Sequence, residues 1–514
     1  MTLSHTDAHA NQQPDRPLWL PPFPLERTFT TAVMGLATLF SLSKPVCATD
    51  LSVYLRMGEW MHTHGTLLER EPFVLSALGS TFQNGTWLSQ WLFYQLFALG
   101  GYPALQVLLA GLMLLTLRLV QLTLRHTGHP RLEGLGVLFA FLFLLQNLGI
   151  RPQSFSIVLF AAVYYLLVVH PLRRFTPPLL VLLMGLWANL HGAFPVALAI
   201  PGVFFVQALL GTRSPLPGDR TLEATAQTAV PPARWVMLGL LMGLGTLLTP
   251  YGPAIYYYIF ENSTMPATRG LDEWLPPRPD TFLGGRFYLG LIFSGALLWQ
   301  VRQKVRLSEL VLWGLFAVLA ARSQRMIVWW GIVSAPVLVR WLQCWLQPPA
   351  PTPASRLHTG LGYGMLVFWA VLGVASWPFL KQPQVDERGD YFNLETDTPV
   401  KVATWLQNAG QGRMFCRFEW GSYFLQRLYP GYQPWIDIRL WIYPDKLWNR
   451  YLAASRGEAG WEQLMEEYHI DTLVLSIQTQ QGLIDAASLH ADWAEAYHDD
   501  QAVVFRHQGR SDAM

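Results

Sequence analysis

Long apolar segments recur along most of the chain and are separated by short polar connections. The first runs from about Phe29 to Ala48, and ten more lie near 102–124, 134–149, 154–170, 177–191, 194–212, 235–250, 283–301, 307–321, 326–346 and 359–379. About 20 apolar residues are needed to cross a bilayer, and shorter segments cross where the bilayer thins. The pattern predicts a polytopic α-helical membrane protein with about 11 transmembrane helices.

The pattern changes after residue 380. Predicted strands at Arg413–Arg417, Gln433–Asp437 and Thr472–Ser476 alternate with helical segments, and a hairpin of Trp493–His498 and Ala502–Arg506 closes the chain. Alternating strands and helices indicate a small α/β sandwich with a mainly parallel sheet. We therefore expect three parts: a polar tail over 1–27, a transmembrane domain over 28–380, and a soluble α/β domain over 381–514.

Composition supports the membrane assignment and argues against a nucleic-acid partner. The chain has 52% hydrophobic and only 14% charged residues, whereas soluble proteins carry roughly 25% charged residues. Its net charge is +2, and it has no basic patch interleaved with aromatic residues, so no nucleic-acid partner is expected. Three cysteines, Cys47, Cys344 and Cys416, show no metal-ligand spacing.

The connections between apolar segments alternate in charge, and this predicts the orientation. Basic connections are found at Arg125 to Arg131, Arg173-Arg174, Arg213 to Arg234, Arg302 to Arg306, and 347–358. The positive-inside rule places these connections, with the N-terminal tail, in the cytoplasm. The other connections, including 49–91 and 249–286, and everything after 380 then lie on the outer side.

The outer stretch 49–91 carries the first candidate for chemistry. It is too polar and broken to cross a bilayer, yet its Tyr and Trp residues suit the membrane–water interface. Asp50 lies at its start, where a carboxylate could take a proton from an acceptor hydroxyl while that hydroxyl attacks a sugar carbon. An alternative is that Asp50 only caps the helix that begins at Leu51.

Further polar residues end apolar segments on the same outer side. Such residues are costly within a bilayer and usually line a cavity, although helix-end residues reaching for headgroups would give the same pattern. Arginines placed there could stabilise a departing lipid phosphate, which needs no general acid. The candidate binding residues are Arg151, Asn189, His191, Glu273, Arg322 and Arg325.

Several short motifs, in order along the chain, resemble the GT-C superfamily of glycosyltransferases. The superfamily includes the protein mannosyltransferases, lipid A aminoarabinose transferases and oligosaccharyltransferases, and the chain resembles a bacterial branch of it. The resemblance covers about residues 30–510 and rests on Asp50 after the first span, Glu71-Pro72-Phe73 through Gly79 to Trp87 and Trp91, Arg151-Pro152, Leu186 to Gly192, Thr249 to Gly252, Glu273-Trp274, Arg325, Trp420 to Tyr423, and Ile436 to Arg439 with Tyr443.

This resemblance implies a membrane glycosyltransferase that uses a polyprenyl-phosphate-linked sugar. It implies Asp50 as base with Glu71 as its nearest acidic partner, an acceptor of unknown identity, and contact with membrane lipid. It further implies a multi-pass protein of the bacterial inner membrane, with the C-terminal domain on the periplasmic side. Many relatives have Asp where this chain has Glu71, and better-studied members have a second acidic residue where it has Leu51.

Three alternatives stay open at this level. Asp437 and Arg439, at the end of a predicted strand, either contact substrate or form a salt bridge that fixes the domain to the outer loops. His191 either binds a divalent metal with Asp50 and a glutamate or, with Asn189, closes its helix by hydrogen bonding. Finally, the chain could be a non-catalytic GT-C-like scaffold that binds lipid or a membrane-protein partner. A transporter is disfavoured, because the polar residues gather at one face.

Overall fold

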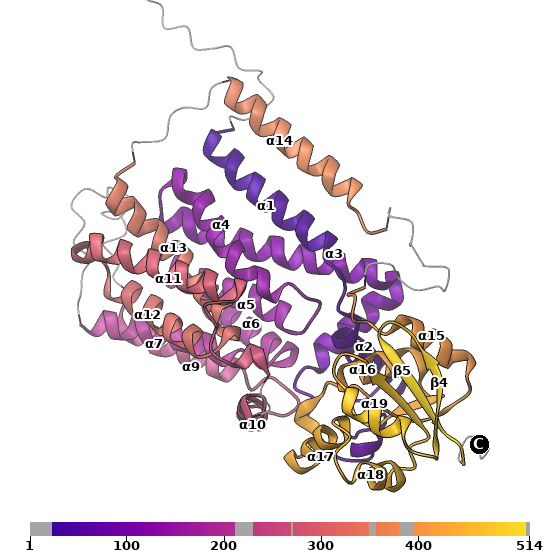
Figure 1. Ribbon diagram of the computed structural model, residues 1–514. Helices are drawn as coiled ribbons and strands as arrows, with labels where there is room; N and C mark the ends of the chain where they lie inside the picture. Colours follow the sequence, from indigo (N-terminus) through magenta and orange to yellow (C-terminus); the bar gives the residue numbers. More distant parts are fainter. Residues whose placement is uncertain (1–22, 211–229, 269–270, 349–355, 380–393, 510–514) are drawn as a thin grey trace, which may run out of the picture.

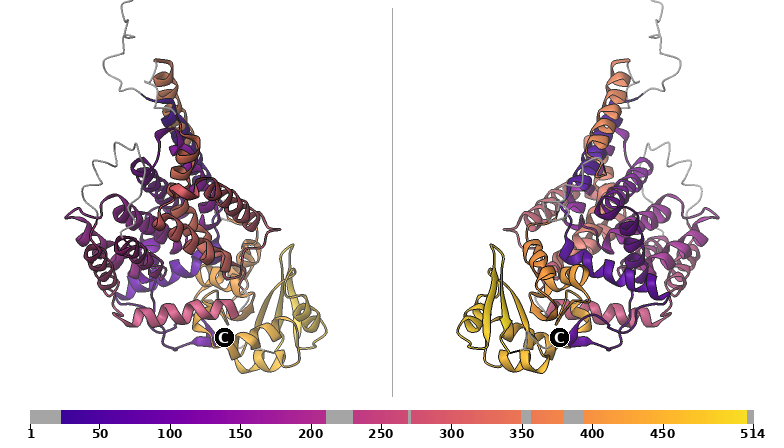
Figure 2. Two further views of the ribbon diagram at one scale, coloured as in Figure 1. Left: turned by 90° about the vertical axis from the view of Figure 1, so that its left-hand side faces the viewer. Right: turned by 90° about the vertical axis from the view of Figure 1, so that its right-hand side faces the viewer.

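The computed structural model describes residues 23–210, 230–268, 271–348, 356–379 and 394–509. It has two parts, a large helical bundle and a smaller sheet domain at one end of the bundle (Figures 1 and 2). Most of the predicted tail 1–27, residues 213–229 of the basic connection 213–234, and the start of the 381–514 region fall outside the described residues.

A helix lies in each of the eleven predicted apolar segments. The helices are α1 (Leu25–Ser43), α3 (Trp87–Thr127), α4 (Glu133–Leu144), α5 (Gln153–Val169), α6 (Thr176–Leu190), α7 (Pro195–Leu209), α9 (Pro232–Gly245), α11 (Phe282–Val301), α12 (Leu307–Arg322), α13 (Ile327–Leu346) and α14 (Arg356–Ala375). Among the described residues, 4 helical stretches are long and apolar enough to span a membrane: Trp87–His126, Phe282–Lys304, Gln324–Leu346 and Leu357–Ala375. Four shorter apolar helices accompany them, and the count of eleven spans stays a prediction.

Helix α3 changes direction near the predicted start of its span. Gly100 and Gly101 interrupt the helical backbone, and Gly101 has a φ of 61°. This left-handed conformation favours glycine, and Pro103 follows two residues later. The kink separates residues 87–99 of α3, of which 87–91 belong to the outer stretch, from the remainder of the helix.

The outer stretch itself begins with a helix, α2 (Ala48–His64), which ends at Gly65 in the left-handed conformation. The two faces of α2 belong to different cores. Leu51 and Leu55 pack into the core of the bundle, whereas Val53, Met57 and Met61 pack into the core of the sheet domain. Each set repeats every four residues, which is the spacing of one helix face. Helix α2 therefore joins the two parts of the molecule.

An irregular segment connects α2 to α3 and contains the short 3-10 helix η1 (Leu75–Ala77). Its two sides are held together by a bridge between Arg70 and Thr81. A further helix, α10 (Ala254–Thr268), lies near this end of the bundle (Figure 1). Tyr258 of α10 lies against Gly85, where an added Cβ would come within 2.3 Å of the tyrosine ring.

The C-terminal domain contains a five-stranded sheet in the order β2-β1-β3-β5-β4. Its strands are β1 (Gly412–Cys416), β2 (Tyr432–Pro434), β3 (Thr472–Ser476), β4 (Trp493–His498) and β5 (Ala502–His507). Its helices are α15 (Val400–Asn408), α16 (Phe418–Leu428), α17 (Asp445–Ser455), α18 (Trp461–Glu467) and α19 (Gln481–Ser488).

The expectation of a mainly parallel sheet is wrong, because the sheet is mixed. Strands β2, β1 and β3 run parallel, but β5 runs antiparallel to β3 and to β4. The predicted hairpin is the reason, since a short turn can only join antiparallel strands. Strand β2 also ends at Pro434, so the predicted strand 433–437 is shorter than expected and its last residues lie in a loop.

Candidate functional site

Asp50 lies in the first turn of α2, at the end of the bundle that faces the sheet domain. Its carboxylate forms an ion pair with the guanidinium of Arg151, and 14% of the Asp50 side chain is exposed. Burial raises the pKa of Asp50, while the charge of Arg151 opposes that rise. A carboxylate with a raised pKa is a stronger base, which suits removal of a proton from a hydroxyl group.

Arg151 begins a chain of alternating charges. Its Nη1 lies 3.8 Å from Oε2 of Glu273, and Oε1 of Glu273 lies 2.7 Å from Nη2 of Arg325. The guanidinium of Arg325 also lies over the Trp274 ring, 4.5 Å from its centroid. Two cations and two carboxylates thus come together, and we call Asp50, Arg151, Glu273 and Arg325 the charged cluster.

Two short 3-10 helices position Glu273 and Arg325 of the cluster. Glu273 belongs to η4 (Asp272–Trp274) and Arg325 to η6 (Gln324–Met326). The backbone N of Gln324 donates to O of Leu275 at 3.0 Å, and its side-chain amide donates to O of Asp272 at 2.8 Å. Because these bonds fix the two backbones together, the Glu273–Arg325 pair does not depend on side-chain contact alone.

Sequence reasoning missed two residues beside the cluster. Tyr54 lies one turn after Asp50 on α2, and burial, followed by the charge of Asp50, raises the pKa of its hydroxyl. Lys44 donates to the carbonyl of Leu148, just before Arg151. The i, i+4 spacing of Asp50 and Tyr54 was a usable signal, because such residues share a helix face.

His191 lies near the cluster, and Arg325 acts on it electrostatically. Its Nδ1 is 2.7 Å from Oγ of Ser156, and this hydroxyl also accepts a bond of 2.7 Å from Nε1 of Trp187. These bonds fix the orientation of the His191 imidazole ring through its Nδ1 atom. The Nδ1 nitrogen of His191 is therefore engaged by Ser156, and within the described residues Nε2 has no hydrogen bond.

Asn189 has a structural role in this arrangement. Its amide donates to O of Gly185 at 2.8 Å and to O of Leu248 at 2.7 Å, and its Oδ1 accepts from Nε1 of Trp87 at 2.8 Å. These bonds close α6 and tie it to α3, as the alternative interpretation of this residue expected. The Arg322 side chain is exposed and pairs with no carboxylate within the described ranges.

The charged cluster does not suit a metal ion. Across the described part of the chain, no three His, Cys, Asp or Glu side chains lie together as metal ligands. The carboxylates of Asp50 and Glu273 instead face Arg151, whose positive charge stands where a cation would bind. The suggested metal site at His191 therefore has no support in the arrangement of these residues.

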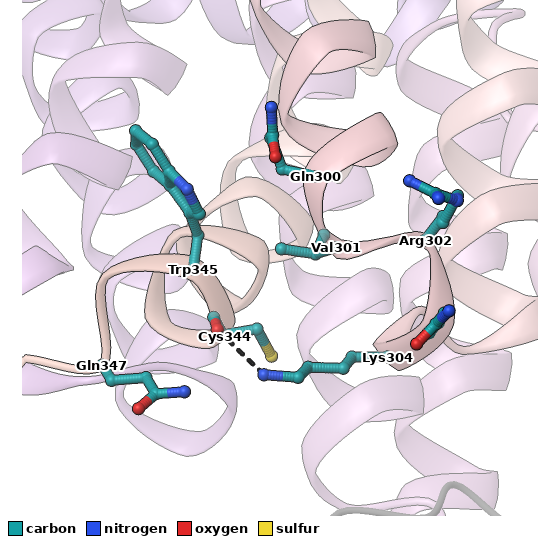
Figure 3. Close-up of a pocket in the computed structure, with 8 residues that line it drawn as sticks. Gln300, Val301, Arg302, Lys304, Cys344, Trp345 and Gln347 are labelled. Atoms are coloured by element: carbon teal, nitrogen blue, oxygen red, sulfur yellow. Dashed lines mark hydrogen bonds between the residues drawn. The ribbon is translucent and has the colours of Figure 1, made fainter.

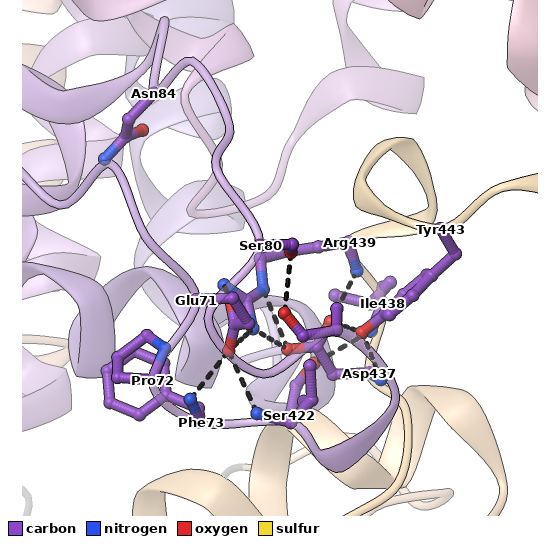
Figure 4. A network of polar contacts seen from close by, with 12 residues as sticks. Glu71, Pro72, Phe73, Ser80, Asn84, Ser422, Asp437, Ile438, Arg439 and Tyr443 are labelled. Carbon is purple, nitrogen blue, oxygen red and sulfur yellow. Dashed lines mark hydrogen bonds and ion pairs between the residues drawn. The ribbon is translucent and has the colours of Figure 1, made fainter.

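Glu71 lies in a second cluster, at the junction between the outer stretch and the sheet domain (Figure 4). Its two carboxylate oxygens accept from Arg439, at 2.5 Å from Nη1 and 3.0 Å from Nη2. The Nε of Arg439 also donates to Asp437 at 2.8 Å. All three side chains are buried, with 0–1% of their surface exposed, so one guanidinium neutralises two carboxylates.

This second cluster, which we call the junction triad, changes two expectations. The expectation that Glu71 is the nearest acidic partner of Asp50 is wrong, because Glu71 is committed to Arg439 and Asp50 faces Glu273 across Arg151. Asp437 and Arg439 form the salt bridge that fixes the domain to the outer stretch. They face each other in the loop after β2 and do not project side by side from a strand end.

Comparisons with known proteins show which solved structures share the fold of this chain. No family model matches the chain, and no curated protein matches it. Solved structures do match. One is the archaeal oligosaccharyltransferase AglB from Archaeoglobus fulgidus, in complex with an inhibitory peptide and a dolichol-phosphate. Its TM-score is 0.53 at 11% identity, and the match covers 90% of this chain and 72% of that one. The same enzyme tethered to an acceptor peptide has a TM-score of 0.53 at 12% identity, with coverages of 93% and 73%.

Proposed function

We propose that this chain, which has the GT-C glycosyltransferase fold, transfers a sugar from a polyprenyl-phosphate donor to an acceptor. The charged cluster carries this proposal, because four segments that are far apart in sequence bring the partly buried carboxylate of Asp50 against Arg151 and link Arg151 through Glu273 to Arg325. The AglB structure named above holds a dolichol-phosphate, which supports a donor of the same chemical class.

The lipid phosphate would bind to Arg151 and Arg325. Each guanidinium can hold phosphate oxygens through parallel hydrogen bonds, and Glu273 now lies between the two. A phosphate that enters this space competes with Glu273 for both cations. Glu273 would keep the two arginines in position until the donor binds, and would then move aside because 41% of its side chain is exposed.

Asp50 would act as the base in the transfer step. It takes the proton from the acceptor hydroxyl, the hydroxyl oxygen bonds to the anomeric carbon, and the bond from that carbon to the phosphate oxygen breaks. The phosphate leaves with the electron pair, and its new charge is stabilised by the arginines. Asp50 must release Arg151 to accept the proton, so binding of the phosphate to Arg151 would also activate the base.

A lysine at position 325 tests the phosphate site. Arg325→Lys keeps the charge but loses the planar pair of donors, so we expect about tenfold weaker binding of a polyprenyl phosphate. Binding is measured with purified protein and undecaprenyl phosphate. The matched control is Arg278→Lys, since Arg278 is 72% exposed and pairs only with the nearby Asp280 among the described residues. Equal affinity of the two variants would leave Arg325 as a membrane anchor.

The proposed membrane topology has a separate test. We propose eleven spans in the bacterial inner membrane, with the tail in the cytoplasm and the 381–514 domain on the periplasmic side. In a chain whose three cysteines are changed to serine, Gln303→Cys should react with a membrane-impermeant maleimide only after the cells are opened. Thr479→Cys should react in cells whose outer membrane alone is permeable. Both positions are exposed, and labelling of both from one side would contradict the topology.

A second candidate function rests on the ion pair of Asp50. Because Arg151 already neutralises this carboxylate, the chain could instead bind a lipid phosphate without catalysis, as a subunit of a larger membrane complex. The two functions separate in one experiment with reconstituted protein. Binding of undecaprenyl phosphate without transfer from any extracted lipid-linked sugar supports the scaffold, whereas transfer that depends on Asp50 supports the enzyme.

A further inference from the structure

A pocket of about 330 Å³ lies between the end of α11 and the last turn of α13 (Figure 3). It is lined by Gln300, Val301, Arg302, Gln303, Lys304, Cys344, Trp345 and Gln347. None of these residues belongs to the charged cluster or to the junction triad. Lys304 extends across the pocket toward α13, where its ammonium group donates to O of Cys344 at 3.3 Å.

The pocket and the charged cluster lie at opposite ends of one membrane-length helix. Arg325 immediately precedes α13, whereas Cys344 and Trp345 belong to its last turn. Helix α13 has 20 residues and is therefore about 30 Å long, which equals the thickness of the hydrocarbon core. If the charged cluster meets one face of the membrane, the pocket meets the other.

The lining of the pocket suits an anion. Arg302 and Lys304 supply two positive charges, the three glutamines supply amide donors, and in the described part of the chain no carboxylate lines the pocket. Arg302 donates only to O of Trp299 among the described residues, at 2.8 Å, and its guanidinium lies 4.7 Å from the centroid of the Trp299 ring. Among the residues that the structure describes, neither Arg302 nor Lys304 pairs with a carboxylate.

A buried ion pair makes the pocket a fixed structure. Arg340, with 4% of its side chain exposed, pairs with Glu309. The same guanidinium donates to the backbone O of Lys304 at 2.9 Å and contacts Sγ of Cys344 at 3.9 Å. The Glu309 carboxylate is therefore already paired with Arg340. Arg340 also links the two walls of the pocket, because it contacts Lys304 on one side and Cys344 on the other.

Two tryptophan side chains lie at the pocket: Trp345 lines it, and Trp299 contacts the lining residue Arg302. Trp299 is 68% exposed and Trp345 is 55% exposed. Both lie at the ends of candidate membrane spans, where tryptophan favours the level of the lipid headgroups. We propose that this pocket binds the phosphate of an anionic phospholipid headgroup, on the side of the membrane opposite the charged cluster.

Lipid retention tests this proposal. The purified full chain is placed in mixed phosphatidylglycerol and phosphatidylcholine, and lipids retained after delipidation are identified by native mass spectrometry. We expect selective retention of phosphatidylglycerol, and roughly 30-fold weaker binding in the variant Arg302→Gln/Lys304→Gln, about five- to sixfold for each basic group removed. An unchanged melting temperature in phosphatidylcholine alone shows that this variant is folded.

The matched control is Arg173→Gln/Arg174→Gln, which removes two exposed charges from another predicted cytoplasmic connection. Retention in this control, combined with loss in the pocket variant, supports the proposal. Equal loss in both variants would overturn it, because a general basic surface would then be responsible. Equal stabilisation by inorganic phosphate and by phosphatidylglycerol would also overturn it. Binding of undecaprenyl phosphate should be unchanged in the pocket variant, which separates this site from the proposed donor site.

Discussion

Asp50→Asn is expected to lower sugar transfer by at least about 100-fold, because the amide cannot accept the proton of the acceptor hydroxyl. The substitution hardly changes the volume of the side chain, and an amide can still accept a hydrogen bond from Arg151. The fold and the binding of undecaprenyl phosphate should therefore be retained. Transfer is measured with labelled lipid-linked sugars, extracted from the cells that make the protein and mixed with the reconstituted chain.

The pH dependence of the same reaction provides a second measurement. The base must be ionised, and burial raises the pKa of Asp50, so transfer should fall with decreasing pH sooner than an ordinary aspartate would predict. Asp485→Asn, at an exposed position of α19, is the control and should behave as the unchanged protein does. Full activity of Asp50→Asn would remove this residue from the mechanism.

Arg439→Met is expected to destabilise the protein by about 3–5 kcal/mol, because the carboxylates of Glu71 and Asp437 would remain buried without a cation. The loss should appear as a lower melting temperature, followed by tryptophan fluorescence in detergent. The control is Arg417→Met, which breaks a partly exposed pair with Glu419 and should cost no more than about 1 kcal/mol.

A triple variant separates the two causes of the lower stability, the unpaired buried charges and the lost packing of the Arg439 side chain. In Glu71→Gln/Asp437→Asn/Arg439→Met all three charges of the junction triad are absent, so part of the stability lost in Arg439→Met should return. If Arg439→Met melts at the same temperature as Arg417→Met, the triad does not hold the domain to the outer stretch.

The helices and the charged cluster could be predicted from the sequence for the same physical reason. Polar and charged side chains are costly inside hydrocarbon, so they occur where apolar segments end. The sequence therefore predicts Asp50, Arg151, Glu273 and Arg325 at one membrane face. Which of these residues pair with each other is not predicted, since the sequence analysis expects Glu71 beside Asp50 and the structure has Glu273 there. Tyr54 is not predicted as a site residue, because an aromatic ring in the outer stretch indicates the membrane interface, and only its i, i+4 spacing from Asp50 points to the cluster.

The junction triad could not be predicted in the same way. Glu71 and Arg439 are 368 residues apart in the chain, and nothing local to either residue specifies the other. The sequence predicts Asp437 and Arg439 at the C-terminal end of a strand over 433–437, but the chain leaves the sheet after Pro434. Tertiary contacts there, including the bond from Ile438 N to Oγ of Ser422 at 3.3 Å, override the local pattern.

The two-faced packing of α2 bears on how this protein can be engineered. Deleting the sheet domain would leave Val53, Met57 and Met61 facing water, on the same helix as Asp50, the residue proposed as base. Exchange of that domain between related proteins should therefore succeed only when the donor's own version of α2 and of the following segment through Glu71 travels with it. A chimera joined only near residue 380 would pair the α2 of one protein with the sheet domain of another. A chimera that also transplants residues 48–86 would keep α2 together with the sheet domain against which it packs.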